Sequence, residues 1–208
     1  MASEPKRPRR TQAERRRETR ERILAATLDV LSKEGHTRFT TTRVASRAGV
    51  SRGAQENYYP TKTALLAAAT TYAMDRAAEQ AAASAKSAAR SADALQAFLD
   101  DASAFFLSST YVAMEELALA GRDDPDVSRI HKAAFVKFRK IHDKIWISAL
   151  IRAGYRPADA ASLVEMTIHL LRGLALTALI LPGRTRTRAL MARWRALATA
   201  ALPLPDKK

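Results

Sequence analysis

The sequence predicts an all-α protein, and three observations support that fold class. Alanine and leucine, both good helix formers, dominate a chain of 208 residues that is 47% hydrophobic. Runs of β-branched residues, which favour strands, are scarce. Apolar residues recur at spacings of three and four in segment after segment, as they do on the buried side of a helix. We expect about nine helices: three short ones followed by about six longer ones.

The first predicted helix follows a polar segment rich in arginine. Residues 1–17 contain proline and many arginines, which indicates a flexible basic arm. The helix is predicted to begin near Thr19, because apolar residues at helical spacing start at Ile23. Gly35 is expected to end it.

The segment after this helix carries the most informative pattern. Thr41 or Thr42 can cap a short second helix that contains the small residue Ala45. Gly49 suits a chain that must reverse with positive φ, and Ser51 can cap a third helix. This order of residues predicts two helices that cross at a tight turn, the helix-turn-helix arrangement.

Proline and glycine mark the ends of several of the remaining helices. We expect helices over about residues 61–77, 95–109, 110–120, 125–153, 157–181 and 185–201, with 77–94 either helical or a loosely ordered helical join. The helix that opens at Pro157 is apolar around most of its circumference toward its end, so it must be covered on two sides. One side can face its own domain, which leaves the other for a second copy of the chain.

The net charge favours a polyanionic partner. Lys and Arg number 35 against 21 Asp and Glu, which gives a formal net charge of +14. Such an excess is typical of proteins that bind nucleic acid or an anionic membrane surface, although a soluble protein from an arginine-rich proteome would also show it. The positive charge is concentrated in residues 1–62, which hold 15 Lys and Arg but only 7 Asp and Glu.

Several other classes of protein and site are disfavoured. Cysteine is absent, and His131 and His142 stand about 16 Å apart on one predicted helix, so we expect no metal and no cofactor. No phosphate-cradling glycine loop and no glycine-flanked serine is present, so we expect no enzyme. We find no apolar stretch long enough to span a bilayer and no signal peptide. A cytoplasmic protein with no membrane partner is the simplest interpretation.

A longer series of features surrounds the predicted turn. In order, it consists of a basic start, a helix, Gly35, a Thr-rich cap, Ala45, Gly49-Val50-Ser51, Gly53-Ala54, an aromatic residue before Pro60, and Lys62. Over residues 19–70 this series resembles the N-terminal domain of the TetR family of transcriptional repressors. The resemblance implies a helix-turn-helix DNA-binding domain over residues 18–64 and a larger helical domain for ligand binding and dimerisation over residues 65–208.

The resemblance also implies which side chains contact DNA. The second helix would touch phosphates or a base edge, the third would enter the major groove, and the start of the fourth would meet a phosphate. The residues assigned in this way are Thr41, Thr42, Arg43, Ser51, Arg52, Gly53, Ala54, Gln55, Glu56, Asn57, Tyr58 and Lys62. Their chemistry agrees, since Asn can pair with adenine, Arg with guanine and a tyrosine hydroxyl with phosphate.

Two positions and the arm leave alternatives open. Gln55 stands where many family members have a leucine that faces the core, so it either hydrogen-bonds internally or turns toward DNA. Glu56 either accepts from a cytosine amino group or points to water. The arm either enters a minor groove, chiefly through Arg15, Arg16 and Arg17, or is a solvated tail that adds non-specific attraction. Its other arginines are Arg7, Arg9 and Arg10.

The same resemblance implies a pocket for an unidentified small-molecule effector, enclosed by the C-terminal helices. Binding there would move the two recognition helices out of register. Aromatic and methionine residues at helical spacing are candidates for the lining, although such stripes are also typical of plain core. The candidates are Phe105, Phe106, Tyr111, Met114, Phe135, Phe138, Trp146, Met166 and His169. Glu115, Glu116 and Arg172 either meet a polar ligand group or pair within the protein.

A homodimer is expected because a single recognition helix contacts few base pairs. Two subunits related by a two-fold axis can bind half-sites about 34 Å apart. The last two helices of each subunit would form a four-helix seam. Its expected residues are Leu163, Ile168, Leu171, Leu174, Leu179, Ile180, Leu190, Trp194 and Leu197.

The predicted function is therefore a homodimeric, sequence-specific transcriptional regulator, a repressor released from double-stranded operator DNA by a small molecule. The alternative is a ligand-independent architectural or nucleoid-associated DNA-binding protein. A helical half larger than the DNA-binding half favours the regulator, because a simple DNA-coating protein has no need of it.

Overall fold

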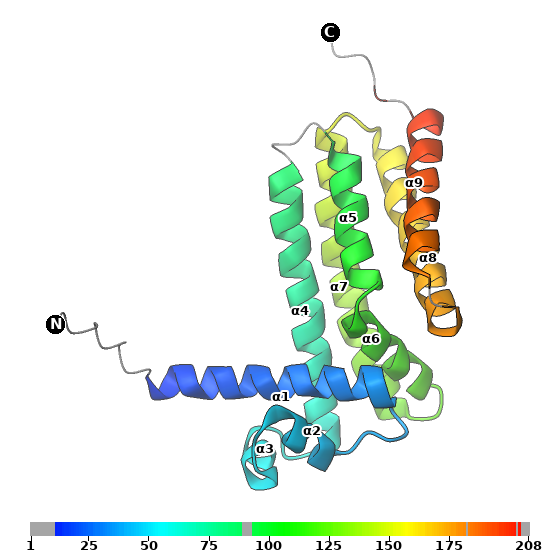
Figure 1. The fold of residues 1–208 in the computed structure, drawn as a ribbon. Coiled ribbons are helices and arrows are strands. Elements are labelled where there is room, and N and C mark those ends of the chain that lie inside the picture. The colour runs from blue at the N-terminus through cyan, green and yellow to red at the C-terminus, as the bar shows by residue number, and fades with distance from the viewer. Residues whose placement is uncertain (1–10, 89–92, 182, 203, 205–208) are drawn as a thin grey trace, which may run out of the picture.

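The computed structural model describes residues 11–88, 93–181, 183–202 and 204, and this part of the chain is built from helices (Figure 1). The helices are α1 (Gln12–Glu34), α2 (Thr41–Ala48), α3 (Arg52–Tyr58), α4 (Lys62–Ala88), α5 (Ala94–Phe106), α6 (Ser109–Ala120), α7 (Pro125–Arg152), α8 (Pro157–Ile180) and α9 (Arg184–Ala201). The described residues contain no strand. The predicted all-α class with nine helices is therefore confirmed.

The helices are arranged as a bundle with a small group of helices across one end. In Figure 1 α4, α5 and α7 run roughly side by side, with α8 and α9 at the flank, and α1 crosses one end of this bundle. Helices α2 and α3 lie against α1 on the side away from the bundle. The predicted helix-turn-helix thus occupies one extremity of the molecule.

Two apolar clusters hold this arrangement. The first joins α1 and α2 to α6 and to the N-terminal halves of α4 and α7, and it includes Ile23, Val44 and Leu65. The second joins the far parts of α4 and α7 to α5, α8 and α9, and it includes Phe98 and Trp146. Burial of each such side chain contributes roughly 1.5–3 kcal/mol. The helix-turn-helix therefore shares its core with α4, α6 and α7, and the expected domain division after residue 64 falls within that shared core.

Helix α1 begins earlier than its apolar pattern indicates. Thr11 caps it: its hydroxyl accepts from the N–H of Glu14 at 3.2 Å, and the Glu14 carboxylate accepts from the N–H of Thr11 at 2.7 Å. This reciprocal pair is a capping box, which fixes a helix start without any buried residue. The predicted start near Thr19 and the predicted flexible arm through residue 17 are therefore wrong over residues 12–17. Arg7, Arg9 and Arg10 lie outside the described residues.

Helix α8 corrects another expectation. By length and composition alone it could cross a membrane, so an apolar stretch of that size does exist. Its residues Ala160, Leu163, Val164, Thr167, Ile168, Leu171 and Ala175 are buried within the protein. It packs against α5 and α7, and its Arg172 forms an ion pair with Glu115 of α6. This packing is that of a core helix with one open side.

Candidate DNA-binding surface and effector site

The turn between α2 and α3 has the predicted geometry. Gly49 ends α2 in the left-handed region, with φ 65° and ψ 40°. The N–H of Val50 then donates to the carbonyl of Ala45 at 3.0 Å, which closes the turn. A Cβ at Gly49 would meet nothing within 4 Å. Glycine is therefore favoured here by its backbone conformation and not by lack of space.

The caps of the two short helices follow the predicted chemistry, with one shift. The hydroxyl of Ser51 accepts from the N–H of Ala54 at 3.1 Å, so the predicted cap of α3 is confirmed. Helix α2 is capped by Thr40, whose hydroxyl accepts from the N–H of Arg43 at 3.3 Å. Prediction of Thr41 or Thr42 as this cap was wrong by one residue, because all three neighbouring threonines have the same capping chemistry.

Helix α3 divides its side chains between core and surface. Ser51, Arg52, Gly53 and Asn57 are exposed, and Tyr58 is partly buried. Gln55, by contrast, is fully buried. Its amide nitrogen donates to the carbonyl of Tyr59 at 3.0 Å, across the C-terminal end of the helix.

Gln55 is thus an anchor of α3 and not a DNA contact, which corrects its assignment. Of the two alternatives that the sequence left open for Gln55, the structure shows the internal hydrogen bond. Its oxygen Oε1 has no hydrogen-bond partner within the described residues. The carboxylate of Glu56 lies at the solvent-exposed surface of α3, where it pairs with the guanidinium of Arg52 at 2.7 Å, and its contact with a cytosine stays a prediction.

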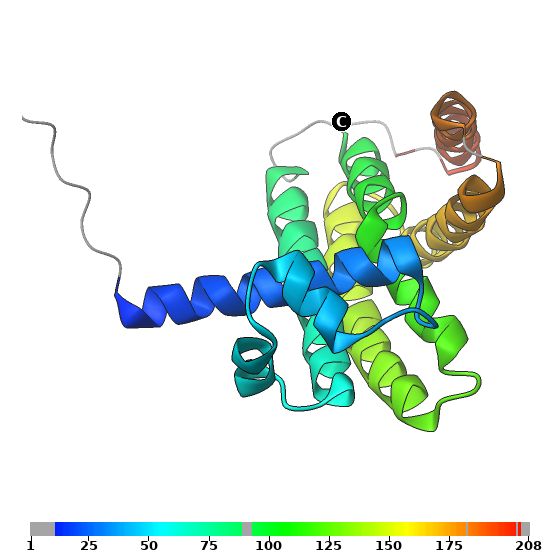
Figure 2. The same ribbon diagram turned by 60° about the horizontal axis from the view of Figure 1, so that its bottom comes forward.

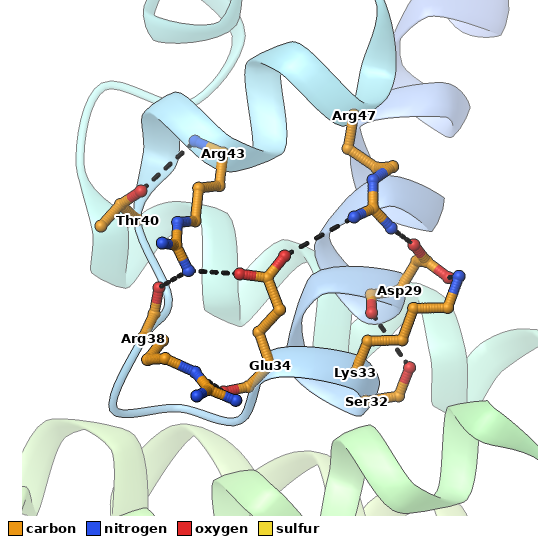
Figure 3. Close-up of polar contacts among 8 residues, drawn as sticks. All are labelled: Asp29, Ser32, Lys33, Glu34, Arg38, Thr40, Arg43 and Arg47. Atoms are coloured by element: carbon orange, nitrogen blue, oxygen red, sulfur yellow. Dashed lines mark hydrogen bonds and ion pairs between the residues drawn. The ribbon is translucent and has the colours of Figure 1, made fainter.

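A network of ion pairs orients α2 against α1. We call it the α1–α2 network, and it consists of Asp29, Lys33, Glu34, Arg43 and Arg47. Figure 3 shows Arg47 between Asp29 and Glu34, 3.5 Å from the latter through Nη2. Arg43 pairs with the same glutamate. Its guanidinium is therefore held toward α1, although its sequence position predicted a DNA contact.

Asp29 is the most strongly engaged acid of this network. Lys33 hydrogen-bonds its carboxylate, with Nζ 2.8 Å from Oδ1, and Arg47 contacts the other oxygen. The hydrogen bond from Lys33, assisted by the charges of Lys33 and Arg47, holds the pKa of the Asp29 carboxyl below its usual value. The ionised form of Asp29 thus helps to position α2.

Lys62 lies at the start of α4, as expected. The hydroxyl of Thr61 accepts from the N–H of Ala64 at 3.0 Å and so caps the helix. The Lys62 ammonium lies 5.6 Å from the centre of the buried Phe39 ring, a cation–π arrangement. The side chain is exposed, so it remains accessible beside the partial positive charge of the helix terminus.

A cavity of about 540 Å³ lies between α1, α4, α5, α6 and α7, within the usual size range of small-molecule sites. Phe105 and Phe138 are the two predicted ligand residues that line it, with ring centres 5.3 Å apart. Sequence reasoning missed its other notable residues, because no periodic signal distinguishes them. These are Asp29, Tyr72, Arg76, Gln80, Asp101 and His142.

The other predicted ligand residues lie elsewhere. Trp146 is fully buried against Phe98 and donates from Nε1 to Asp101 at 2.9 Å, so it acts as core. Met114 is buried between α6 and the N-terminal helices. Phe106 lines a different cavity of about 480 Å³ near α8 and α9. Assignment of Met166 and His169 to a pocket was wrong, because both are exposed on the outer side of α8.

Tyr111 and Phe135 belong to a partly buried polar cluster. Arg172 donates to the Tyr111 hydroxyl at 2.9 Å and to the Glu115 carboxylate at 2.9 Å, and its guanidinium lies over the Phe135 ring. The neighbouring His131 ring stacks on Phe135. Burial raises the pKa of Tyr111 and lowers that of His131. Glu115 and Arg172 therefore pair with each other, which settles the open alternative for these two residues.

Glu116 joins α6 to the end of α1. Its carboxylate accepts from the N–H of His36 at 3.0 Å, just after the C-terminal Gly35 of α1. A Cβ added at Gly35 would lie 3.0 Å from Glu116 Oε2. A movement of α6 would therefore also displace the segment between α1 and α2.

The predicted dimer residues are only partly at the surface. Leu163, Ile168 and Leu171 are buried in the core of their own subunit, so their assignment to a dimer seam was wrong. Leu174 and Trp194 are half-buried, and Trp194 donates from Nε1 to Thr167 at 2.8 Å. Helical periodicity could not tell the two apolar sides of α8 apart.

The open sides of α8 and α9 nevertheless carry a row of exposed apolar side chains. Four of the predicted residues belong to it: Leu179, Ile180, Leu190 and Leu197. Three more were missed by the sequence pattern: Met166, Leu176 and Leu181. The two helices themselves lie at the flank of the bundle, away from α2 and α3 (Figure 1).

Taken together, these features define a class of protein: a helix-turn-helix DNA-binding protein with a helical body that contains a cavity and an exposed apolar face. Comparisons with known proteins agree. Residues 23–69 match the family model described as bacterial regulatory proteins, tetR family. The chain is 33% identical over 171 residues to the HTH-type transcriptional regulator CymR of Pseudomonas putida, a match that covers 82% of this chain and 84% of CymR.

Solved structures show the same fold. A TetR-family regulator from Mesorhizobium loti MAFF303099 superimposes with a TM-score of 0.71 at 13% identity, covering 92% of this chain and 96% of that one. The multidrug binding protein EbrR, complexed with imidazole, gives a TM-score of 0.55 at 20% identity, covering 90% and 97%. The chain belongs to the tetR family of bacterial regulatory proteins, and is a DNA-binding transcriptional regulator and not an enzyme.

Proposed function

We propose that this regulator is a homodimeric repressor, released from double-stranded operator DNA by a small molecule in the cytoplasm. The observation that carries the proposal is the division of α3 between a buried Gln55 and an exposed Asn57. A recognition helix needs one side fixed to the protein and the other free for base edges. Thr42, Tyr58 and Lys62 flank that free side and can position the duplex through its phosphates.

The exposed apolar row on α8 and α9 supports the homodimer. Ile180 is 80% exposed and Leu179 is 58% exposed, and Leu176 and Leu181 near them in sequence are exposed as well. Contiguous exposed apolar surface of this kind marks a protein–protein interface. Two copies that pair through it with two-fold symmetry would present two α3 helices to successive turns of one duplex.

The cavity supports the response to a ligand. It combines aromatic walls from Phe105 and Phe138 with ionisable groups such as Arg76 and Asp101, which suits a small amphipathic molecule. Its wall also includes Asp29, a member of the α1–α2 network. An occupant that displaced this wall would weaken the network that positions α2, and would lower affinity for DNA.

Selection from random DNA tests this function. The full-length wild-type protein selects duplexes from a randomised library, and the enriched sequences are then bound at fixed salt by fluorescence anisotropy. We expect an inverted repeat whose half-sites lie about one helical turn apart or a multiple of it. A panel of aromatic acids, amines and neutral aromatics is then screened for a rise in the melting temperature, and a true inducer should also weaken binding to the selected duplex.

The outcomes separate this function from its rival. The net charge of +14 favours an architectural DNA-binding protein as the second candidate. If no consensus sequence is enriched, and random duplex binds as tightly as any selected one, the architectural function is supported and the regulator with a defined operator is contradicted.

A further inference from the structure

The first half of α1 projects from the body of the protein as a free helix. Figures 1 and 2 show it extending past α3 and α4, with no other helix beside its first turns. The capping box of Thr11 and Glu14 fixes its start. An α-helix is about 10–12 Å across with its side chains, whereas the minor groove is about 6 Å wide. Residues 12–17 therefore cannot enter a minor groove in the manner expected of a flexible arm.

The charged side chains of this projecting segment are unevenly distributed around the helix. Arg16, Arg17 and Arg20 lie on one face together with Glu21, and all four are exposed. At about 100° per residue, Arg15 and Arg22 fall on the opposite face with Glu18 near them, whereas Glu14 lies between the two faces, next to Glu21. One face thus carries three arginines and one glutamate, the other carries two arginines and one glutamate, and Glu14 lies between them.

The arginine-rich face is the one that lies beside the recognition helix. Arg16, Arg17 and Arg20 line a groove of about 680 Å³, and Asn57 and Tyr58 of α3 line the same groove. The groove is open to solvent, and its α3 wall ends in the exposed Asn57. Duplex DNA engaged by Asn57 would therefore lie within reach of these arginines.

We propose that this face of α1, formed by Arg16, Arg17 and Arg20, is a second DNA-contact surface that binds backbone phosphates of the duplex held by α3. The inference rests on the proposed function, and it adds a partner surface that a flexible arm would not provide. A guanidinium presents a planar fork of donors that matches a phosphate. Because the cap already orders the backbone of this helix, binding costs little further backbone entropy, and only side-chain entropy is lost.

The surface contributes affinity and not sequence preference. Contacts to phosphates position a protein on the duplex, whereas base edges carry the sequence information. Each phosphate neutralised contributes about 0.9 to the slope of log affinity against log salt concentration. Arg16 and Arg17 of both subunits of a dimer would together account for a slope of up to about 4.

A matched pair of variants tests the surface. Arg16→Gln/Arg17→Gln removes two charges from the groove face, and Arg15→Gln/Arg22→Gln removes two from the opposite face of the same helix. Glutamine keeps the helix propensity close to that of arginine, and circular dichroism checks that helix content is unchanged. The duplex selected by the wild-type protein, and a scrambled duplex of equal length and composition, are titrated with each full-length variant over a range of salt concentrations.

For the groove-face variant, we expect the slope of log affinity against log salt concentration to become shallower by up to about 4. Its affinity should fall for both duplexes, and the ratio of the two affinities should not change. The opposite-face variant should lose clearly less. Equal losses in the two variants would overturn the proposal, because they would show a general effect of net charge. A fall confined to the selected duplex would also overturn it, since base contacts would then be involved. If the wild-type protein selects no consensus, it is the proposed function that fails, and the scrambled duplex still reports on α1.

Discussion

At the scale of single residues, the division of α3 depends on Gln55. A polar side chain at a position that faces the core is costly unless it is hydrogen-bonded. Gln55 meets this cost in part through its bond to the Tyr59 carbonyl, while its Oε1 has no partner within the described residues. The side chain therefore fixes the end of α3 from inside, and the DNA-facing side is left to its neighbours.

This arrangement predicts opposite behaviour for two positions on α3. Gln55→Leu should leave the free energy of unfolding within about 1 kcal/mol of wild type, because one hydrogen bond and one buried unpaired oxygen are removed together. Its preference for the selected over the scrambled duplex should not change. Asn57→Ala should instead reduce that preference by about 1–3 kcal/mol for each half-site.

Both variants are measured by chemical denaturation and by anisotropy with the two duplexes. A loss of sequence preference in Gln55→Leu, at unchanged stability, would show that this side chain reaches DNA after all. The assignment of Gln55 as an internal anchor would then be wrong.

At the scale of elements, ion pairs on the outer side of α2 join it to α1, in addition to the apolar contacts of Val44 and Ala48. The α1–α2 network lies partly exposed to solvent, with the Asp29 side chain 32% exposed and the Arg47 side chain 41% exposed. Such pairs contribute modestly to stability when taken one at a time. Several that share Glu34 and Arg47 hold α2 in one orientation, which is the property that DNA binding requires.

The lowered pKa of Asp29 gives this network a pH signature. A carboxyl whose pKa is depressed by folding stabilises the protein above its unfolded value of 3.8, and this stability is lost as pH falls through the folded pKa. The free energy of unfolding of wild type should therefore fall more between about pH 5 and about pH 3 than that of Asp29→Asn. Urea denaturation at the two pH values measures the difference.

Lys33→Gln provides the companion measurement, because Lys33 is the chief cause of the shift. The Lys33→Gln variant should show a pH dependence of the free energy of unfolding that is closer to that of Asp29→Asn. Identical pH dependence in wild type and Asp29→Asn would contradict a carboxylate that is held ionised by its neighbours.

At the scale of the whole molecule, the two ends of the chain have separate tasks. The helix-turn-helix lies at one extremity, and α8 and α9, which carry the exposed apolar row, lie at the flank of the bundle (Figure 1). Helices α4 and α7 contribute to both apolar clusters and so connect the two regions. Glu116, through its bond to the N–H of His36, adds a polar link between α6 and the end of α1.

This separation predicts that dimerisation can be removed without unfolding the subunit. Leu179→Glu places a charge in the apolar row, whereas Leu119→Glu places one on α6 at almost equal exposure, 58% against 57%. Light scattering with size-exclusion chromatography should report a monomer for Leu179→Glu and a dimer for Leu119→Glu. Binding to the selected duplex should fall at least about tenfold in the monomer, because one α3 per molecule remains.

Circular dichroism verifies that both variants stay helical. A Leu179→Glu protein that remains dimeric at micromolar concentration would place the interface elsewhere on the molecule.

The sequence by itself determined the helical class, the turn at Gly49 and the cap of α3 at Ser51. These features depend on short-range chemistry: a positive φ that glycine tolerates, and hydroxyls that accept from free N–H groups within three residues. The resemblance over residues 19–70 also placed the chain in the right family, because a recognition helix depends on a fixed local order of residues. The capping box at Thr11 was equally readable from sequence, although the apolar pattern drew the predicted start to Thr19.

Only the tertiary structure decided which side of each helix faces the core, a cavity or the solvent. Leu163 and Leu179 lie about 160° apart around α8, on two sides that are both apolar in sequence, yet one is buried in its own subunit and the other is exposed. The aromatic residues of α5, α6 and α7 look equivalent in sequence, yet only some line the cavity between α1, α4, α5, α6 and α7. Periodicity fixes an angle around one helix axis, whereas burial depends on the neighbours that the remainder of the chain brings to that angle.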